Sequence, residues 1–299
     1  MKHMPTSIKV IDDLCGGGLL ANAVNTIYGN PSTAKTSLAM TIAFSAIEQQ
    51  KDNASKVIVI DTESGWSDAR IQKAAEGRKI SLQLLPERLK KYSATMLGEQ
   101  HKMIMDVIPT DLKENDWELG LIVVDSLVAF YHAQLLSAPT TVLASKSREL
   151  QGRLSLEINS LLKLATGYEA PVLLVTWTKS TASKSFGERE RKGVLQELGK
   201  GVLVNDLECG LGSRQFDIIG GQHLTYMTKT MLHLASIKGE PFTKVVSLEK
   251  SIERPTYMGG LVKVTDKGVE DVKGSKPMPL NELMQQVVLE DIEEEKKKA

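Results

Sequence analysis

The sequence predicts an α/β protein in which a mostly parallel, twisted sheet carries helices on both faces and antiparallel strands at its C-terminal edge. The first observation is a set of short, continuous apolar runs bounded by turn residues, at 25–28, 57–60, 121–124 and 172–175. Such runs are typical of strands buried on both faces. The second is a helical spacing of apolar residues between the runs, for example over 38–47 and 154–164. Strands that alternate with helices indicate a parallel sheet.

The C-terminal part of the chain has a different pattern. Closely spaced strands are predicted at 231–236, 243–248 and 260–264, joined by turns that contain glycine or proline. We expect these strands to extend the sheet in antiparallel fashion at its far edge. Residues 1–272 are assigned to one core domain, and residues 273–299 to a charged C-terminal tail that forms a partly ordered helix.

Composition excludes several classes of function. The 299 residues include 37 basic and 37 acidic side chains, so contact with nucleic acid requires a local basic patch and not a global charge. Cys15 and Cys209 are too few for a disulfide framework. No charged-then-apolar leader opens the sequence, and no apolar run approaches the roughly 20 residues that cross a bilayer. We therefore expect a cytoplasmic protein that does not contact a membrane.

A phosphate-binding loop is predicted between the first apolar strand and the helix that begins near Lys35. Backbone N–H groups of such a loop and the positive end of the helix dipole bind phosphates, Lys35 reaches the β- and γ-phosphates, and Thr36 ligates magnesium. Ala34 stands where the usual pattern has its second glycine, at a cost of about 1 kcal/mol if the residue takes a positive φ. The residues expected to bind ATP here are Gly29, Ser32, Thr33, Ala34, Lys35, Thr36 and Ser37.

Two acidic side chains follow the second and third strands. Glu63 comes just past the carboxyl end of the second strand, where ligands bind in open α/β sheets, and is predicted to orient an attacking water as the catalytic residue. Asp125 follows four apolar residues of the third strand and is predicted to bind the magnesium ion. The order of loop, glutamate and aspartate, each at the end of a strand, is much more specific than any one of them.

A long basic segment follows the fourth strand. About forty residues with little apolar periodicity run from there to residue 220, with glycines among the charges. A flexible basic loop is suited to the phosphates of single-stranded nucleic acid, although a merely solvated loop explains the same composition. The residues predicted to contact DNA are Lys179, Lys184, Arg189, Arg191 and Lys192.

Two further cations follow a predicted edge strand. Lys250 and Arg254 could each reach the γ-phosphate of a neighbouring subunit, as a finger residue does in trans. The alternative is that both are exposed turn residues.

Over roughly residues 5–272, the chain resembles the core ATPase of the RecA/RadA recombinase superfamily, and within it the archaeal RadB branch. Residues 11–19 (I-D-D-L-C-G-G-G-L) and 59–70 (V-I-D-T-E-S-G-W-S-D-A-R) are similar to two segments of that family, and 248–255 to a RadB segment. The resemblance implies that Glu63 is catalytic and that Arg70 stacks on adenine. It also implies a first DNA-binding loop at 131–147 and a second in the basic segment. The sequence T-W-T at 176–178 departs from the family's T-N-Q.

The resulting hypothesis is a RecA-fold protein that binds ATP and Mg²⁺ and acts on single-stranded DNA, on a recombinase or other repair protein, or on both. It assists homologous recombination and DNA repair, hydrolyses ATP slowly or not at all as a weak DNA-dependent ATPase, and could form a homo-oligomer. One alternative is a KaiC-like regulatory ATPase that switches protein partners without DNA. Another is an interaction module with a decayed nucleotide site.

Overall fold

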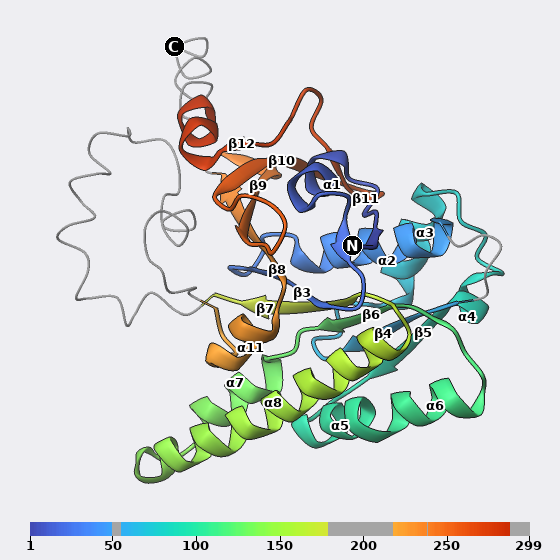
Figure 1. The fold of residues 1–299 in the computed structure, drawn as a ribbon, viewed down its shortest axis with the longest axis vertical. Helices are drawn as coiled ribbons and strands as arrows, with labels where there is room; N and C mark the ends of the chain where they lie inside the picture. The colour runs from blue at the N-terminus through green and yellow to red at the C-terminus, as the bar shows by residue number, and fades with distance from the viewer. Residues whose placement is uncertain (50–54, 179–217, 238, 288–299) are drawn as a thin grey trace.

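A ten-stranded sheet separates two layers of helices in the computed structural model, which describes residues 1–49, 55–178, 218–237 and 239–287 (Figure 1). The strands lie in the order β11-β10-β9-β8-β3-β7-β6-β4-β5, with β12 paired to β10, and β1 and β2 form a separate small sheet. The strand bounds are β1 His3–Met4, β2 Leu19–Leu20, β3 Val24–Gly29, β4 Lys56–Asp61, β5 Leu89–Ser93, β6 Leu119–Asp125, β7 Val172–Trp177, β8 Thr230–Ile237, β9 Glu240–Lys250, β10 Met258–Thr265, β11 Gly268–Asp271 and β12 Met278–Pro279.

The helices divide between the two faces of the sheet. Residues of α1, α2 and α3 share one apolar cluster with the sheet, and residues of η1, α6, α8 and α11 share another on the opposite face. The bounds are α1 Lys9–Cys15, α2 Lys35–Gln49, α3 Asp68–Gly77, α4 Leu85–Arg88, α5 Leu97–Lys102, the π-helix η1 Met103–Val107, α6 Ile108–Glu114, α7 Ala129–Leu136, the 3₁₀-helix η2 Thr140–Val142, α8 Leu143–Gly167 and α11 Gly221–Met227.

The central strands confirm the predicted parallel α/β sheet. Strands β8, β3, β7, β6, β4 and β5 run parallel, and all six residues of β3 and all seven of β6 are buried. Continuous apolar sequence is required there because helices cover both faces. The carboxyl ends of β3, β4 and β6 consequently lie on the same side of the sheet, and each strand ends at or near a predicted site residue.

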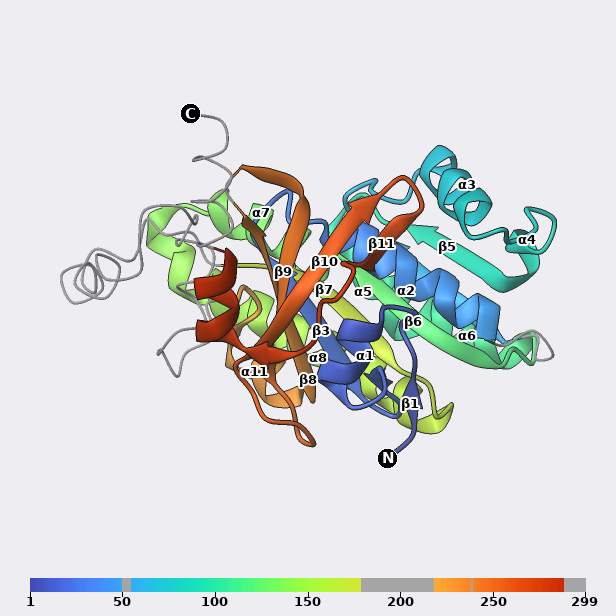
Figure 2. The same cartoon turned by 90° about the horizontal axis from the view of Figure 1, so that it is seen from above.

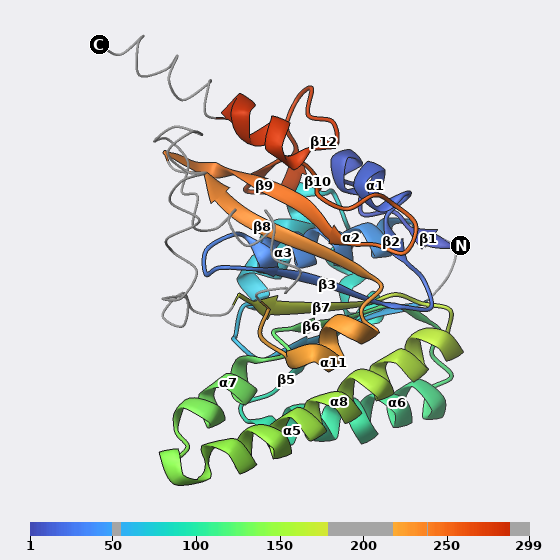
Figure 3. The ribbon, with the colours of Figure 1, turned by 60° about the vertical axis from the view of Figure 1, so that its left-hand side comes forward.

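Residues 231–236 were expected to pair in antiparallel fashion, and this prediction is wrong for one of the two strands beside them. Strand β8 runs parallel to β3, with Asn25 opposite Thr230, and only from β9 onward do the strands turn antiparallel. Helix α11 explains the difference, because it returns the chain to the starting end of the sheet before β8 begins (Figure 3). The antiparallel edge is therefore β9, β10, β11 and β12.

The C-terminal residues of the described chain pack on that edge. Residues 280–287 are helical, and their apolar side chains form a cluster with β8 and β9 that includes Ala235, Val245 and Leu283. Residues 288–299 lie outside the described residues. Within the described ranges, no helix has both the length and the apolar character needed to span a membrane.

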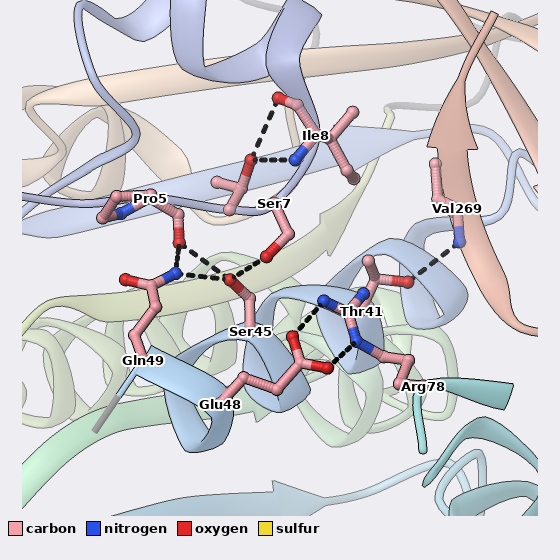
Figure 4. A network of polar contacts seen from close by, with 10 residues as sticks. Pro5, Ser7, Ile8, Thr41, Ser45, Glu48, Gln49, Arg78 and Val269 are labelled. Carbon is pink, nitrogen blue, oxygen red and sulfur yellow. Dashed lines mark hydrogen bonds and ion pairs between the residues drawn. The ribbon is translucent and has the colours of Figure 1, made fainter. Parts of the chain in front are cut away.

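Helix α2 is held on one side by the N-terminal segment. The backbone carbonyl oxygen of Pro5 accepts hydrogen bonds from Oγ of Ser45 at 3.0 Å and from Nε2 of Gln49 at 2.7 Å (Figure 4). Oγ of Ser7 lies 2.6 Å from Oγ of Ser45. These contacts fix the C-terminal half of the helix that follows the predicted phosphate loop.

Two further contacts join α2 to β11 and to the end of α3. Oγ1 of Thr41 accepts the backbone N–H of Val269 at 2.9 Å, and Glu48 pairs with Arg78 at 2.6 Å (Figure 4). The view from above shows β11 lying beside α2 (Figure 2). The position of the helix, and with it the position of the loop at its N-terminus, is thus set by three separate parts of the chain.

Candidate nucleotide-binding site

The predicted phosphate loop joins β3 to α2, as the sequence indicates. Strand β3 ends at Gly29, and α2 begins at Lys35. Ser32 and Ala34 have φ values of 64° and 70°, so both take the left-handed conformation. Ala34 therefore bears the strain expected from its sequence, about 1 kcal/mol relative to glycine. A helix N-terminus with a tight preceding loop directs backbone N–H groups outward, where they can bind an anion.

Gly29 is required by the close approach of β8. A Cβ atom at this position would lie 2.3 Å from the backbone carbonyl oxygen of Leu234 and 2.8 Å from Oγ1 of Thr33. Neither contact is compatible with a side chain. The glycine that opens the loop is thus fixed by packing against the neighbouring strand.

The ammonium group of Lys35 points back into the loop. Its Nζ donates a hydrogen bond to the backbone carbonyl oxygen of Asn30 at 2.7 Å, and Oγ1 of Thr33 donates to the same oxygen at 2.9 Å. The adjacent cavity has a volume of about 350 Å³. It is lined by Pro31, Ser32, Ala34, Lys35, Thr36, Ser37, Glu63, Arg70, Asp125 and Trp177. The predicted lysine, hydroxyl and two carboxylates therefore face one space.

Asp125 lies at the end of β6 and is almost fully buried, with 3% of its surface exposed. Burial raises the pKa of its carboxyl group to about 6, and the charges of Glu63 and Asp61 add to the rise. Hydrogen bonds from Thr36 and Trp66 act in the opposite direction. A divalent cation at this carboxylate would offset the cost of burying its charge.

Asp61 organises the turn that carries Glu63. One carboxylate oxygen accepts the backbone N–H of Gly65 at 3.0 Å, and the other accepts that of Trp66 at 3.0 Å. Oγ1 of Thr62 donates to the backbone carbonyl of Ser126 at 2.8 Å, which ties this turn to the end of β6. The short turn therefore holds Glu63 at the mouth of the cavity.

Glu63 has a partner that the sequence did not indicate. The indole Nε1 of Trp177 donates a hydrogen bond to Oε1 of Glu63 at 3.1 Å. Trp177 is the last residue of β7, the strand beside β3, and that position is the signal that could have found it. Ligand sites in α/β proteins are lined by residues at the carboxyl ends of the strands.

Arg70 lies between the phosphate cavity and a second, smaller one. Its guanidinium donates to the backbone carbonyl of Gly65 at 2.5 Å and to Oγ of Ser37 at 3.3 Å. The second cavity, of about 240 Å³, is lined by Ser37, Met40, Thr41, Arg70, Lys73, Ala74, Thr265, Asp266 and Gly268. A base lying there would place its phosphates in the first cavity, because the two share Ser37 and Arg70.

These residues fit ATP with magnesium. The left-handed loop and helix N-terminus suit phosphates, and Thr36 beside Asp125 offers the hydroxyl and carboxylate oxygens that Mg²⁺ prefers. Comparison with protein families gives a match to the Rad51 family model over residues 1–195. The chain belongs to the Rad51 family. The resemblance to the RecA/RadA superfamily is thereby confirmed.

Curated relatives and solved structures agree with this membership in the Rad51 family. The chain is 26% identical over 273 residues to the DNA repair and recombination protein RadB of Thermococcus onnurineus, covering 91% of this chain and 98% of that protein. It is 28% identical over 272 residues to RadB of Pyrococcus furiosus, covering 90% and 96%. A crystal structure of the RadB recombinase matches with a TM-score of 0.63 at 23% identity, covering 90% and 99%, which confirms the predicted fold.

Other residues predicted for this Rad51-family chain lie away from the cavity. Lys250 ends β9 opposite Met231, near the starting end of β3, and its Nζ donates to the backbone carbonyl of Thr225 at 2.5 Å. Arg254 donates to the backbone carbonyl of Asp13 at 3.2 Å. Both lie at the end of the sheet opposite the phosphate loop. Within one copy, the structure therefore does not bring them to the nucleotide.

The two predicted DNA-binding loops have different outcomes. Residues 131–147 are helical for the most part, since α7, η2 and the start of α8 occupy them. These elements form a hairpin that extends beyond the sheet (Figure 3). The residues predicted for the second loop lie outside the described residues: Lys179, Lys184, Arg189, Arg191 and Lys192.

Proposed function

We propose that this protein binds ATP with Mg²⁺ and assists homologous recombination and DNA repair by acting on single-stranded DNA, on a recombinase or other repair protein, or on both. One observation carries the nucleotide part of the proposal. Lys35, Thr36, Glu63 and Asp125 come from three different strand ends and line a single cavity of about 350 Å³. Side chains of these types at one cavity match the needs of phosphoryl transfer.

Each residue has a distinct role in the proposal. Lys35 leaves Asn30 to pair with the β- and γ-phosphates, and Arg70 stacks on the base. Thr36 and Asp125 would hold Mg²⁺, which would supply positive charge beside the phosphate oxygens. Glu63 accepts a proton from water as the water oxygen bonds to the γ-phosphorus, and the bond to the bridging oxygen breaks with its electrons going to ADP.

Hydrolysis is proposed to be slow. The methyl group of Ala34 lines the cavity at the position where phosphates approach the backbone most closely. The hydrogen bond from Trp177 occupies one oxygen of Glu63. The Ala34 methyl group and the Trp177 hydrogen bond both act at the site where ATP would be hydrolysed.

The role in recombination is supported by the relatives, whose name is DNA repair and recombination protein RadB. We place this role in the cytoplasm. The basic segment from Lys179 to Lys192 would bind the phosphates of single-stranded DNA. In a homo-oligomer, Lys250 and Arg254 would reach the γ-phosphate of the next copy. The alternative of a regulatory ATPase that never contacts DNA receives no support from these relatives.

The proposal is tested by magnesium-dependent ATP binding to the wild type and to Lys35→Ala, with Lys90→Ala as the matched control. Lys90 lies exposed on the edge strand β5, far along the sheet from the phosphate loop. We expect Lys35→Ala to weaken binding at least tenfold, or about 1.4 kcal/mol, and Lys90→Ala to bind as the wild type does. Equal binding by all three proteins would remove the phosphate-loop assignment.

Steady-state ATPase activity with and without single-stranded DNA tests the proposed action on DNA. We expect a slow basal rate that DNA increases, and DNA binding that weakens as the salt concentration rises. Absence of binding to DNA even at low salt, together with intact ATP binding, would favour the regulatory ATPase.

A further inference from the structure

Trp177 lines the nucleotide cavity and contacts residues on two sides of its ring. On one side, its indole N–H donates to Oε1 of Glu63 at 3.1 Å. On the other side, its ring lies edge-on to the imidazole of His132 in α7, with centroids 5.6 Å apart and planes at 79°. Glu63 is exposed, and Trp177 is partly exposed while it packs against the edge of an apolar cluster.

The residue after Trp177 contacts the phosphate loop. Oγ1 of Thr178 hydrogen-bonds to Oδ1 of Asn30, whose backbone carbonyl accepts Nζ of Lys35. The end of β7 therefore touches both the carboxylate and the loop. A change in the loop when Lys35 turns to a phosphate can reach Trp177 through the hydrogen bond between Asn30 and Thr178, which is bonded directly to Trp177.

We propose that Trp177 is a positioning residue that holds Glu63 in an inactive arrangement, and that its indole must leave Glu63 before the carboxylate can orient water at the γ-phosphate. This inference rests on the proposed function, since it assumes that Glu63 acts on bound ATP. Removal of the indole N–H should therefore raise the rate of ATP turnover.

The restraint follows from the hydrogen-bonding capacity of a carboxylate. A general base must lie within about 3.2 Å of the water it activates, with a lone pair directed at the water's proton. The indole N–H occupies one oxygen of Glu63 and fixes the direction of the carboxylate plane. Because indole is a donor only, it cannot pass the interaction on to a water or accept a proton itself. A freed Glu63 can turn toward the cavity that it already lines.

The test is the variant Trp177→Phe, which removes the N–H and keeps an aromatic ring beside His132. We expect kcat for ATP to rise about fivefold, as the loss of one exposed hydrogen bond to a charged group predicts, and KM to change by less than about twofold. Trp117→Phe is the matched control, since Trp117 lies beside Lys56 and Lys90 at the far edge of the sheet. It should leave both constants unchanged.

A second pair of measurements separates a restraint on Glu63 from a general loosening of the site. In the double variant Trp177→Phe with Glu63→Gln, the gain in kcat should disappear, because the gain acts through the Glu63 carboxylate. The change in tryptophan fluorescence when magnesium-ATP binds should shrink in Trp177→Phe and persist in Trp117→Phe. If Trp177→Phe only loosens the site, the gain in kcat should remain in the double variant.

The outcomes distinguish this inference from the proposed function. If Trp177→Phe binds ATP and its kcat is unchanged or lower, Trp177 does not restrain Glu63, while the nucleotide assignment stands. If the double variant keeps the gain, the effect does not pass through Glu63 and the inference is again overturned. If neither the wild type nor Trp177→Phe binds ATP, the proposed function itself fails.

Discussion

The indole nitrogen of Trp66 lies 3.0 Å from Oδ2 of Asp125 and donates a hydrogen bond to that buried carboxylate. Trp66 is fully buried, and its backbone N–H also donates to Asp61 at 3.0 Å. One tryptophan thus connects the turn after β4 with the end of β6. Glu63 accepts an indole N–H from Trp177 in the same way, so the two carboxylates proposed for the site each have a tryptophan donor.

Replacing Trp66 by phenylalanine should destabilise the protein because Asp125 loses a donor where water cannot replace it. A hydrogen bond to a buried charged group is worth about 1.5–3 kcal/mol, and we expect the free energy of unfolding at pH 8 to fall by about that amount. Urea unfolding measures the change. Trp117→Phe makes the same truncation without removing a bond to a carboxylate, so a loss of equal size in that control would refute the assignment to Asp125.

Replacing Ala34 by glycine should strengthen the binding of magnesium-ATP. The methyl group of Ala34 lines the phosphate cavity, and its φ of 70° strains a residue that has a Cβ. Since the loop already has this conformation without ligand, the strain is common to the free and bound states, and we expect the gain from removing the methyl group beside the phosphates: a decrease of about fivefold in Kd, or about 1 kcal/mol. Titration with magnesium-ATP measures it.

Asn22→Gly is the control for this prediction. Asn22 has a φ of 58° in an exposed position before β3, so the substitution gives the same backbone freedom away from the site. We expect its Kd to match the wild type. No gain in Ala34→Gly would mean that the loop already tolerates the methyl group.

Much of the sheet could be predicted because its central strands are locally encoded. The four apolar runs became β3, β4, β6 and β7, since a strand covered on both faces needs apolar residues throughout. Strand β5 was missed because it is an edge strand with the sequence L-K-K-Y-S, and charge on an edge strand hides its periodicity. The parallel pairing of β8 was missed because strand direction depends on the crossover through α11 and not on the strand's own residues.

In the candidate site, too, some residues could be predicted from the sequence and others could not. Lys35, Glu63 and Asp125 could be predicted because each lies at the end of a strand or shortly after it, and the carboxyl ends of parallel strands lie on the same side of the sheet. The two indole contacts could not, since they join residues 59 and 114 positions apart and depend on side-chain directions across different strands. Donors of this kind are found only when the fold brings their partners within reach.

Removing the hydroxyl group of Thr41 should destabilise the contact between α2 and β11. Oγ1 of Thr41 accepts the N–H of Val269 at 2.9 Å and donates to the backbone carbonyl of Ser37 at 2.9 Å. Thr41→Val keeps the shape but leaves a buried N–H without a partner, which costs about 1–3 kcal/mol. Thr41→Ser keeps the hydroxyl and should lose less than half as much in urea unfolding. A larger loss in Thr41→Ser than in Thr41→Val would show that the methyl group matters more than the hydrogen bond.

The buried carboxyl group of Glu249 should make stability depend on pH. Burial raises its pKa above the ordinary value of 4.5, and the hydrogen bond from Ser247, at 2.6 Å, only partly opposes the rise. Between 4.5 and the raised value, the folded state binds more protons than the unfolded state, so stability falls as the pH rises. The contribution is fully present below 4.5 and is lost as the pH rises through the folded pKa.

Glu249→Gln removes the charge and keeps an oxygen that can accept from Ser247. At pH 8 we expect the variant to be more stable than the wild type, and the difference to vanish near pH 4, where the wild-type carboxyl is protonated. Urea unfolding at several pH values measures the difference. Glu270→Gln, on the exposed side of β11, should show no such pH-dependent gain. A gain at pH 8 that persists undiminished at pH 4 would show that burial of the ionised Glu249 is not its cause.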